Sequence, residues 1–232
     1  AGFRLTTATV LKSGMIALDV ALQNSTSGNR LPVAIVPSAG LPLEEQLGTI
    51  HSSVNPWGIY LNITEPEVLR PTLRLLSKLY AQNLLWNPVW ISMAVSFGSF
   101  ETLGYMQGEE FLEAINTIFP YVTIAPSWPR EVLTAGYTEP LIKDMLTLCK
   151  DLWQQVSFQL EAAPLTRSWL ATTKLLESSP SYTVTVQHSY SEGSEWDGLP
   201  ALRSIRTHTQ MGVYYKIPRQ FRNALIANVL TS

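Results

Sequence analysis

Residues 57–96 read WGIYLNITEPEVLRPTLRLLSKLYAQNLLWNPVWISMAVS and combine two short apolar runs with a segment of helical spacing between them. The runs Trp57–Ile63 and Val89–Ser96 are rich in β-branched and aromatic residues, which is typical of strands. The segment Pro66–Tyr80 repeats its apolar residues on one helical stripe: Leu69, Leu73, Leu76 and Tyr80. A strand, a helix and another strand in this order predict a parallel βαβ unit.

The same alternation continues towards the C-terminus. Further strands are predicted at Tyr121–Ala125, Val156–Leu160, Tyr182–His188 and Gly212–Ile217. Helices are predicted at Gly108–Phe119, Pro140–Trp153, Leu165–Glu177, Leu199–His208 and Arg219–Leu230. Parallel strands covered by helices predict an α/β fold, either a TIM-like barrel or an open doubly wound sheet. Both architectures place ligand sites at the C-terminal ends of the strands.

The N-terminal part has a different pattern. Three strand-like pieces, Arg4–Val10, Met15–Leu22 and Pro32–Val36, are joined by turns too short for helices, so we expect hairpin-like or irregular structure there. A short helix is predicted at Leu43–His51. The total of nine strand candidates is one more than a regular barrel holds, so at least one N-terminal strand should lie at the barrel edge or floor. We expect one domain spanning residues 1–232.

Composition excludes several classes of function. The chain has 232 residues, 46% hydrophobic and 15% charged, with a net charge of −2, so it has no basic footprint for nucleic acid. No apolar run reaches the roughly 18 residues of a membrane span, so we expect no membrane contact by this domain. The single cysteine, Cys149, excludes an internal disulfide and is interpreted as a buried small hydrophobe.

Short motifs are few. Glycine-rich phosphate loops, a nucleophile elbow and zinc-type Cys/His spacings are all missing from the sequence, so we expect no cofactor of those classes. Two N-glycosylation sequons occur, at Asn24 and Asn62. Asn24 lies in a polar loop and is the glycosylation candidate, whereas Asn62 lies on a predicted strand.

Candidate ligand-binding residues lie near the predicted strand ends: Asp19, Asn62, Trp128, Glu161, His188 and Lys216. Asp19 interrupts an apolar strand, where a carboxylate is costly unless it is paired or solvated. It is either a metal ligand or general acid, or a carboxylate at the strand end that caps a neighbouring backbone group. Asp19 and Glu161 are compatible with the carboxylate pair of a barrel glycosidase. His188 is either a base or a hydrogen-bonded structural histidine. The residues alone leave these alternatives open.

Four segments of the chain form a recognisable pattern: Asn55–Ile63, Pro88–Ser92, Phe119–Trp128 and Val213–Lys216. Segments similar to these come in the same order, with similar gaps, in one known family. Through them the chain resembles the menorin family, and most closely the second, C-terminal domain of its two-domain, membrane-anchored vertebrate member. The family is similar to glycerophosphodiester phosphodiesterase barrels. The resemblance therefore implies a TIM-barrel-like (β/α)8 fold with an irregular N-terminal strand region.

The resemblance also implies which residues an active relative would carry. A phosphodiesterase-like site uses histidines on the first and third strands, Glu-x-Asp on the second and Lys-x-Asp on the fourth, to hold a divalent metal and move protons. The first strand of this chain, Leu5–Val10, has no histidine. The later matching positions hold, in chain order, Ala17, Asp19, Val36, Tyr60, Asn62, Ser92 and Ala94. Only Asp19 is retained, so we expect no metal site.

These departures favour a catalytically inactive barrel that acts as an extracellular binding or structural module. We expect it to belong to the ectodomain of a membrane-anchored or shed protein, beside a companion barrel domain of the same chain. The alternative is a phosphodiesterase or hydrolase rebuilt from Asp19, Glu161 and His188. The partner is expected to be a protein, a small molecule or a glycan.

The mouth of the barrel is expected to combine the six candidate residues with the ring of Tyr60. Such a mouth is either filled by its own side chains or open as a cleft of about 300 Å³ or more. We favour the filled form, because large residues stand where catalytic groups would be.

Overall fold

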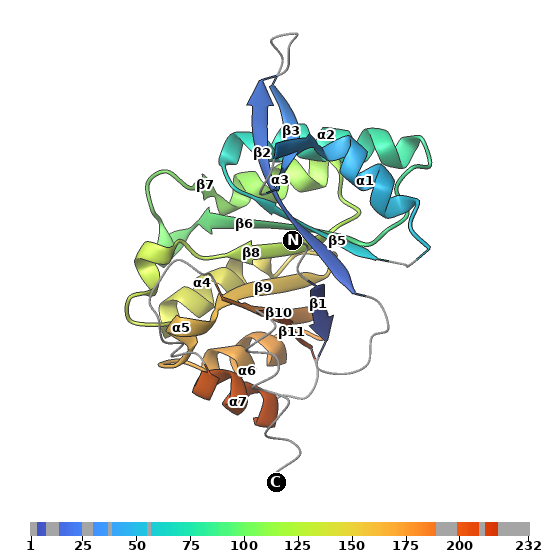
Figure 1. Ribbon diagram of the computed structural model, residues 1–232. Coiled ribbons are helices and arrows are strands. Elements are labelled where there is room, and N and C mark those ends of the chain that lie inside the picture. Colours follow the sequence, from blue (N-terminus) through green and yellow to red (C-terminus); the bar gives the residue numbers. More distant parts are fainter. Residues whose placement is uncertain are drawn as a thin grey trace.

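The computed structural model describes residues 4–7, 14–24, 30–36, 39–54, 57–188, 199–208 and 212–217. Figure 1 shows a strongly curled sheet with helices on its outer face. The strands are β1 Arg4–Thr7, β2 Met15–Asn24, β3 Arg30–Val36, β4 Ala39–Pro42, β5 Gly58–Ile63, β6 Val89–Ser96, β7 Met106–Gln107, β8 Thr123–Ser127, β9 Val156–Glu161, β10 Tyr182–Gln187 and β11 Val213–Lys216. The helices are α1 Leu43–His51, α2 Pro66–Ala81, α3 Gly108–Ile118, α4 Glu139–Cys149, α5 Ala162–Leu165, α6 Leu170–Glu177 and α7 Leu199–His208.

Eight of these strands form a ring. Their order runs from β1 through β11, β10, β9, β8, β6 and β5 to β2, and β1 also pairs with β2. The pairings from β2 to β11 are parallel, whereas β1 is antiparallel to both of its neighbours. The mixed α/β, TIM-barrel-like fold is therefore confirmed.

The N-terminal strands give the ring its irregularity. In β2, Met15–Val20 pair with β5, while Asp19–Asn24 pair with β3, which in turn pairs with β4. The strands β2, β3 and β4 thus form an antiparallel extension, the hairpin, which continues past the end of β5 and rises at the top of Figure 1. This placement confirms the expectation that an N-terminal strand lies at the barrel edge.

The main hydrophobic core lies between the outer face of the ring and the helices. It includes one residue from or next to each of six strands: Leu61, Ile91, Val122, Phe158, Val184 and Val213. Leu73 of α2 and Ile115 of α3 are fully buried in the same cluster. The amphipathic stripes read from the sequence are thus the faces that cover the barrel.

Several element boundaries differ from the predicted ones. The strand predicted at Tyr121–Ala125 lies two residues later in β8, and the side chain of Tyr121 is 61% exposed. The helix predicted at Leu165–Glu177 is divided into α5 and α6, because residues between them make backbone bonds to the third preceding carbonyl, as Ser168 does with Leu165. Helix α4 ends at Cys149, four residues before the predicted end. The predicted helix Arg219–Leu230 lies outside the described residues.

Replacing Leu73 or Ile115 by alanine should lower the free energy of unfolding by about 2 to 5 kcal/mol, because each leaves a cavity against the ring. Urea denaturation measures the change. Leu103→Ala is the matched control: its side chain is 99% exposed, so the expected change is within about 0.5 kcal/mol. Equal stability of all three variants would contradict the placement of α2 and α3.

Candidate functional site

The interior of the ring is filled by a small aromatic cluster. Met15, Tyr60, Trp90 and Ala125 are buried together, with Tyr214 packed against them. The Trp90 ring lies 6.5 Å from the Tyr60 ring and 5.0 Å from the Tyr214 ring, the latter edge to face. These distances are those of favourable aromatic pairs. Below its mouth, the barrel is therefore a packed core rather than a channel.

Tyr60 connects this aromatic cluster to a polar network. Its hydroxyl donates to Oε1 of Gln159 at 3.0 Å, and Nε2 of Gln159 donates to the Ser157 carbonyl at 2.7 Å. The hydroxyls of Ser157 and Thr185 lie 2.9 Å apart on the neighbouring strands. Burial raises the pKa of the Tyr60 phenol well above 10.0, against the opposing effect of a hydrogen bond with Ser92. The phenol is neutral and serves as a buried donor.

The mouth of the barrel carries two carboxylates, each held by an amide from the adjacent strand. Nδ2 of Asn62 donates to Oδ1 of Asp19 at 2.8 Å. Across the ring, Nε2 of Gln187 donates to Oε1 of Glu161 at 2.9 Å. The strand register places Asp19 beside Asn62, and Glu161 beside Gln187. Both carboxylates therefore have fixed orientations on rigid strands.

Lys216 places a cation inside the same mouth. Lys216 is paired with Gln187 in the register of β11 and β10, and its Nζ lies 4.5 Å from the centre of the Tyr60 ring, within the range of cation–π attraction. Burial lowers the pKa of Lys216, while the charges of Asp19 and Glu161 oppose this shift. Among the described residues, no carboxylate oxygen lies within 4.0 Å of Nζ. The ammonium thus interacts with both carboxylates from longer range.

His188 lies directly after β10, and its backbone N–H donates to the Lys216 carbonyl at 3.3 Å. Burial lowers the pKa of its imidazole, and the charge of Glu161 partly offsets this effect. Asn62, Glu161, His188 and Lys216 therefore lie on or next to the C-terminal strand ends, as the sequence indicated. Asp19 lies in the middle of the long strand β2, but its register with Asn62 brings it to the same level of the ring.

The expectation that Trp128 lines the mouth is wrong. Its side chain is only 3% exposed, and its indole Nε1 donates to the Leu141 carbonyl in α4 at 3.1 Å. The Trp128 ring packs against Phe158 and Tyr137 on the outer face of the ring. Side chains alternate along the chain, so the residue after the inward-facing Ser127 points outward. Trp128 therefore stabilises the helix layer.

The two sequons also differ in environment. Asn24 is exposed at the end of β2. The Asn62 amide is held by Asp19 and lies inside the mouth, so its side chain is already engaged. Only Asn24 retains the exposure that glycan attachment needs.

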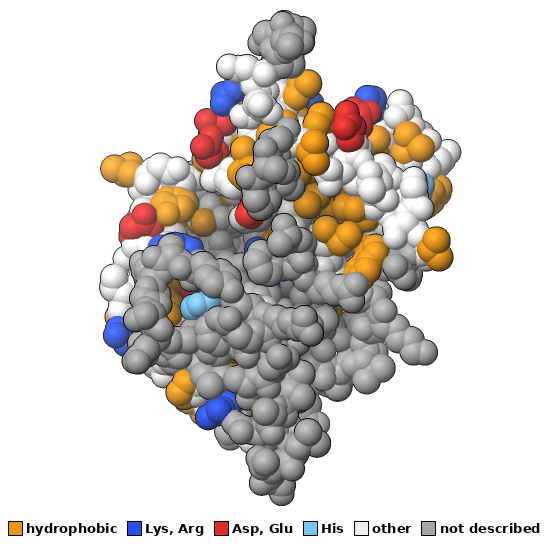
Figure 2. All heavy atoms as spheres, in the orientation of Figure 1, with side chains coloured by type: hydrophobic (Ala, Val, Ile, Leu, Met, Phe, Trp, Pro, Cys, Tyr) orange, Lys and Arg blue, Asp and Glu red, His pale blue; other side chains and the backbone are white. Residues whose placement is uncertain are grey.

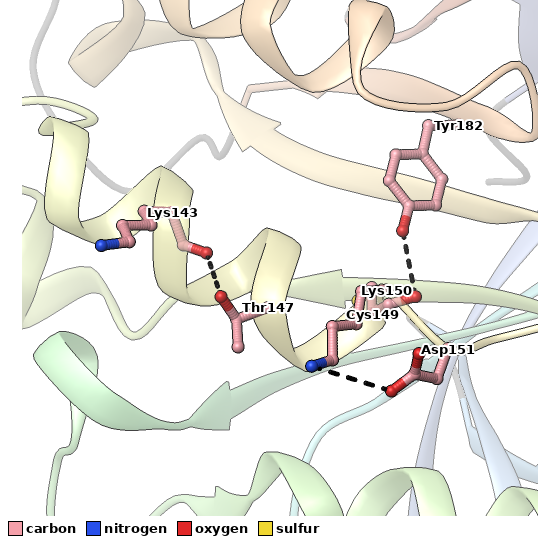
Figure 3. A network of polar contacts seen from close by, with 6 residues as sticks. All are labelled: Lys143, Thr147, Cys149, Lys150, Asp151 and Tyr182. Atoms are coloured by element: carbon pink, nitrogen blue, oxygen red, sulfur yellow. Dashed lines mark hydrogen bonds and ion pairs between the residues drawn. The ribbon is translucent and has the colours of Figure 1, made fainter.

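Cys149 is fully buried at the end of α4, in agreement with its interpretation as a hydrophobe. Burial raises the pKa of its thiol to about 12, which keeps the sulfur protonated. Figure 3 shows its surroundings: the hydroxyl of Tyr182 donates to the Cys149 carbonyl at 3.0 Å, next to the Lys150–Asp151 ion pair at 4.0 Å. This network fixes the last turn of α4 and contains no reactive nucleophile.

The hairpin adds an apolar wall beside Asp19. Ile35 stands opposite Asp19 in the strand register and is 51% exposed, and Leu31, four residues earlier on β3, is 50% exposed. Both share the face of the hairpin on which Asp19 lies, because residues two apart point to the same side. Figure 2 shows hydrophobic side chains gathered along this part of the surface. The mouth thus has a polar floor and one apolar side.

The side chains at the mouth do not fit a divalent metal of the kind that phosphodiesterase-like barrels hold. Within the described ranges, no group of three His, Cys, Asp or Glu side chains is placed to bind a metal ion. The oxygen donors beside Asp19 come from the amide of Asn62, and Lys216 adds a positive charge. Magnesium and calcium require several oxygen ligands with negative charge.

Some residues of the site were not singled out from the sequence, although a signal for them was present. Gln159, Gln187, Ser157 and Thr185 occupy alternate positions in β9 and β10. Polar residues at every second position of otherwise apolar strands predict a polar inner face. The hydroxyl of Tyr137, which accepts the Glu161 backbone N–H at 2.7 Å, lies in a loop and had no such signal.

Comparisons with known proteins agree with this geometry. The family described as the Menorin N-terminal domain matches residues 3–222. Human Protein FAM151B is 28% identical over 179 residues, which are 74% of this chain and 63% of that protein. This chain therefore spans less than two thirds of the length of that relative.

Among solved structures, a candidate glycerophosphodiester phosphodiesterase from Galdieria sulphuraria is similar in fold. The two structures overlap with a TM-score of 0.53 over 93% of this chain and 85% of the other, at 13% sequence identity. Within the part of this chain that the structure describes, no helix has the length and apolarity needed to cross a membrane.

Replacing Tyr60 by phenylalanine should lower the free energy of unfolding by about 1 to 3 kcal/mol, because Oε1 of the buried Gln159 loses its donor. Thermal or urea unfolding measures the loss. The control is Tyr105→Phe, which removes a hydroxyl bonded to the exposed Glu131 at 2.9 Å and should change stability by less than about 0.5 kcal/mol. A Tyr60→Phe variant as stable as the control would contradict the proposed network.

Proposed function

Since the chain belongs to the menorin family, we propose that it is a catalytically inactive phosphodiesterase-like barrel that acts as a binding or structural module. The scaffold of the barrel is retained, and its packed interior gives a rigid support. Fold alone does not determine function, so the proposal depends on the residues at the mouth. Those residues differ from a metal-dependent site in charge as well as in identity.

The observation that carries the proposal is the ammonium of Lys216 at the mouth. It lies over the Tyr60 ring and interacts with the charges of Asp19 and Glu161. A divalent cation bound to either carboxylate would have to compete with this internal cation. The Coulomb repulsion between charges of +2 and +1 a few ångströms apart is worth several kcal/mol at an effective dielectric constant of about 20. The barrel therefore supplies its own counter-ion instead of a metal.

Proton transfer is also poorly supported. Tyr60 replaces the lysine that the family resemblance implies, and its phenol is held neutral by burial. Of the other matching positions only Asp19 is ionisable; Ala17, Ser92 and Ala94 contribute no ionisable group. Without a metal and a positioned acid, hydrolysis of a phosphodiester lacks both stabilisation of charge and protonation of the leaving group.

The location and partners follow from the same proposal. We place the domain outside the cell, in the ectodomain of a membrane-anchored or shed protein, beside a companion barrel of the same chain. The exposed Asn24 at the end of β2 supports a glycosylated surface. The partner would be a protein on the outer surface, or a small molecule or glycan at the mouth.

A rebuilt hydrolase is the alternative, and one observation favours it. Burial lowers the pKa of His188, and the charge of Glu161 acts on the same imidazole, so a neutral base stands near a carboxylate. Such a pair could accept a proton from water. Asp19 would then have to stabilise or orient the substrate.

Turnover assays separate the two functions. We expect no hydrolysis of glycerophosphodiesters or cyclic nucleotides by the wild-type protein. Activity that disappears in both Asp19→Ala and His188→Gln, but persists in the surface control Asp151→Ala, would establish the hydrolase instead.

Calorimetric titration with magnesium, calcium and manganese tests the role of Lys216. The wild-type protein should not bind any of them more tightly than about 10 μM. Lys216→Gln removes the internal cation and should strengthen manganese binding by at least about tenfold, equivalent to 1.4 kcal/mol. Lys143→Gln, a change on the exposed face of α4, should leave the affinity unaltered. Tight binding by the wild-type protein would contradict the proposal.

A further inference from the structure

Lys216 differs in environment from the other described lysines. Lys78, Lys143, Lys150 and Lys174 all lie on or next to helices with exposed side chains. Three of these four pair with carboxylates: Lys78 with Glu44 at 2.9 Å, Lys174 with Glu139 at 3.2 Å and Lys150 with Asp151 at 4.0 Å. Lys216 lies on a strand, points into the ring and stays partly exposed at the mouth.

The contacts of Lys216 leave its nitrogen available for reaction. The nearest described partner is the face of the Tyr60 ring, 4.5 Å from Nζ, and no described carboxylate oxygen lies within 4.0 Å. A ring face attracts the ammonium but forms no hydrogen bond that would hold a particular N–H. Losing the proton therefore breaks no ion pair, and burial favours the neutral amine.

The charged groups around Nζ act in opposite directions. Asp19 from β2 and Glu161 from β9 favour the ammonium, as does the Tyr60 ring from β5, while burial disfavours it and has the largest effect. Among the described residues, His188 and Tyr214 are further titratable groups near the mouth; burial lowers the pKa of His188 and raises that of Tyr214, and both shifts favour the neutral form. A partly buried lysine whose pKa is lowered by burial is the type that proteins use to form Schiff bases.

The mouth also limits the ligand. Among the described side chains of the mouth, two carboxylates accompany one ammonium, and this balance of charge disfavours a phosphorylated compound. The amides of Asn62 and Gln187 offer further hydrogen bonds to hydroxyl groups, and Ile35 provides an apolar side wall. A small, uncharged compound with hydroxyl groups fits this arrangement.

We propose that Lys216 captures a small uncharged aldehyde or ketone as a Schiff base at the mouth of the barrel. After Lys216 loses its proton to water, the lone pair of Nζ attacks the carbonyl carbon, and the carbonyl oxygen takes up a proton to give a carbinolamine. Loss of that oxygen as water leaves a protonated imine. The iminium keeps the positive charge beside Asp19 and Glu161, so the electrostatic balance of the mouth is preserved. The proposal names a ligand class and rests on the proposed binding role.

Reductive trapping tests it. The folded wild-type protein is incubated with D-glyceraldehyde and cyanoborohydride across a range of pH, and the modified lysines are quantified by peptide mass spectrometry. Each unit of lowered pKa raises the free-amine fraction about tenfold near neutral pH. Lys216 should therefore react at least about threefold faster than Lys143 at pH 7, with its half-maximal rate at a lower pH. Modification of Lys216 at the rate of Lys143 or more slowly would overturn the proposal.

Variants make the result specific. Lys216→Arg keeps the cation and its stacking on Tyr60 but forms no imine, so the adduct at this position should disappear while surface lysines react unchanged. Asp19→Asn removes a charge that favours the ammonium and should increase the rate at Lys216, whereas the surface change Asp151→Asn should not. An unaltered rate in Asp19→Asn would show that the charge of Asp19 does not affect the reactivity of Lys216, and would contradict the proposed electrostatic setting. Failure of trapping together with absent metal binding and hydrolysis would refute this inference and leave the inactive-barrel proposal standing.

Discussion

The contact between the Lys216 ammonium and the Tyr60 ring, at 4.5 Å, joins β11 to β5, two strands that are not neighbours in the ring. Tyr60 packs in the aromatic cluster inside the ring and donates a hydrogen bond to Gln159. Lys216, at the mouth, interacts with the negative charges of Asp19 and Glu161. A lysine can occupy this interior only where a ring face and negative charges compensate for lost hydration. The identity of the residues around it follows from that constraint.

This arrangement explains how a barrel can persist without metal chemistry. The mouth holds the exposed carboxylate of Asp19 and the half-buried carboxylate of Glu161, and a divalent cation usually relieves the repulsion where carboxylates share a site. Here the amides of Asn62 and Gln187 fix the carboxylates, and Lys216 supplies the positive charge. The charges of the mouth are thus balanced by the chain's own side chains rather than by an ion.

The fold followed from the sequence because its signals are local and repeated. Alternating strands and amphipathic helices predicted the ring, and Leu73, on the apolar stripe predicted for Pro66–Tyr80, is buried against it. The short strand β4, with Gly40 and Pro42, had no apolar alternation from which to predict it. The division between α5 and α6 depends on backbone hydrogen bonds around Ser168, which periodicity does not report.

The site was predicted only in part, for a related reason. The ends of strands can be predicted from a sequence, so Asp19, Asn62, Glu161, His188 and Lys216 were all selected as residues near predicted strand ends. The direction of each side chain depends on the register, and Trp128 was misplaced because it lies one residue beyond the inward-facing Ser127. The stacking of Lys216 on Tyr60 joins residues far apart in the chain, and no local pattern encodes it.

The central claim is that a single ammonium inside the mouth interacts with both carboxylates. An NMR titration of the Lys216 side chain, followed at Cε and Nζ in isotopically labelled protein, tests it most directly. The account predicts a pKa below the ordinary 10.5 in the wild-type protein, and a further decrease in both Asp19→Asn and Glu161→Gln. A Lys216 pKa equal to those of the surface lysines and unchanged by either substitution would contradict it.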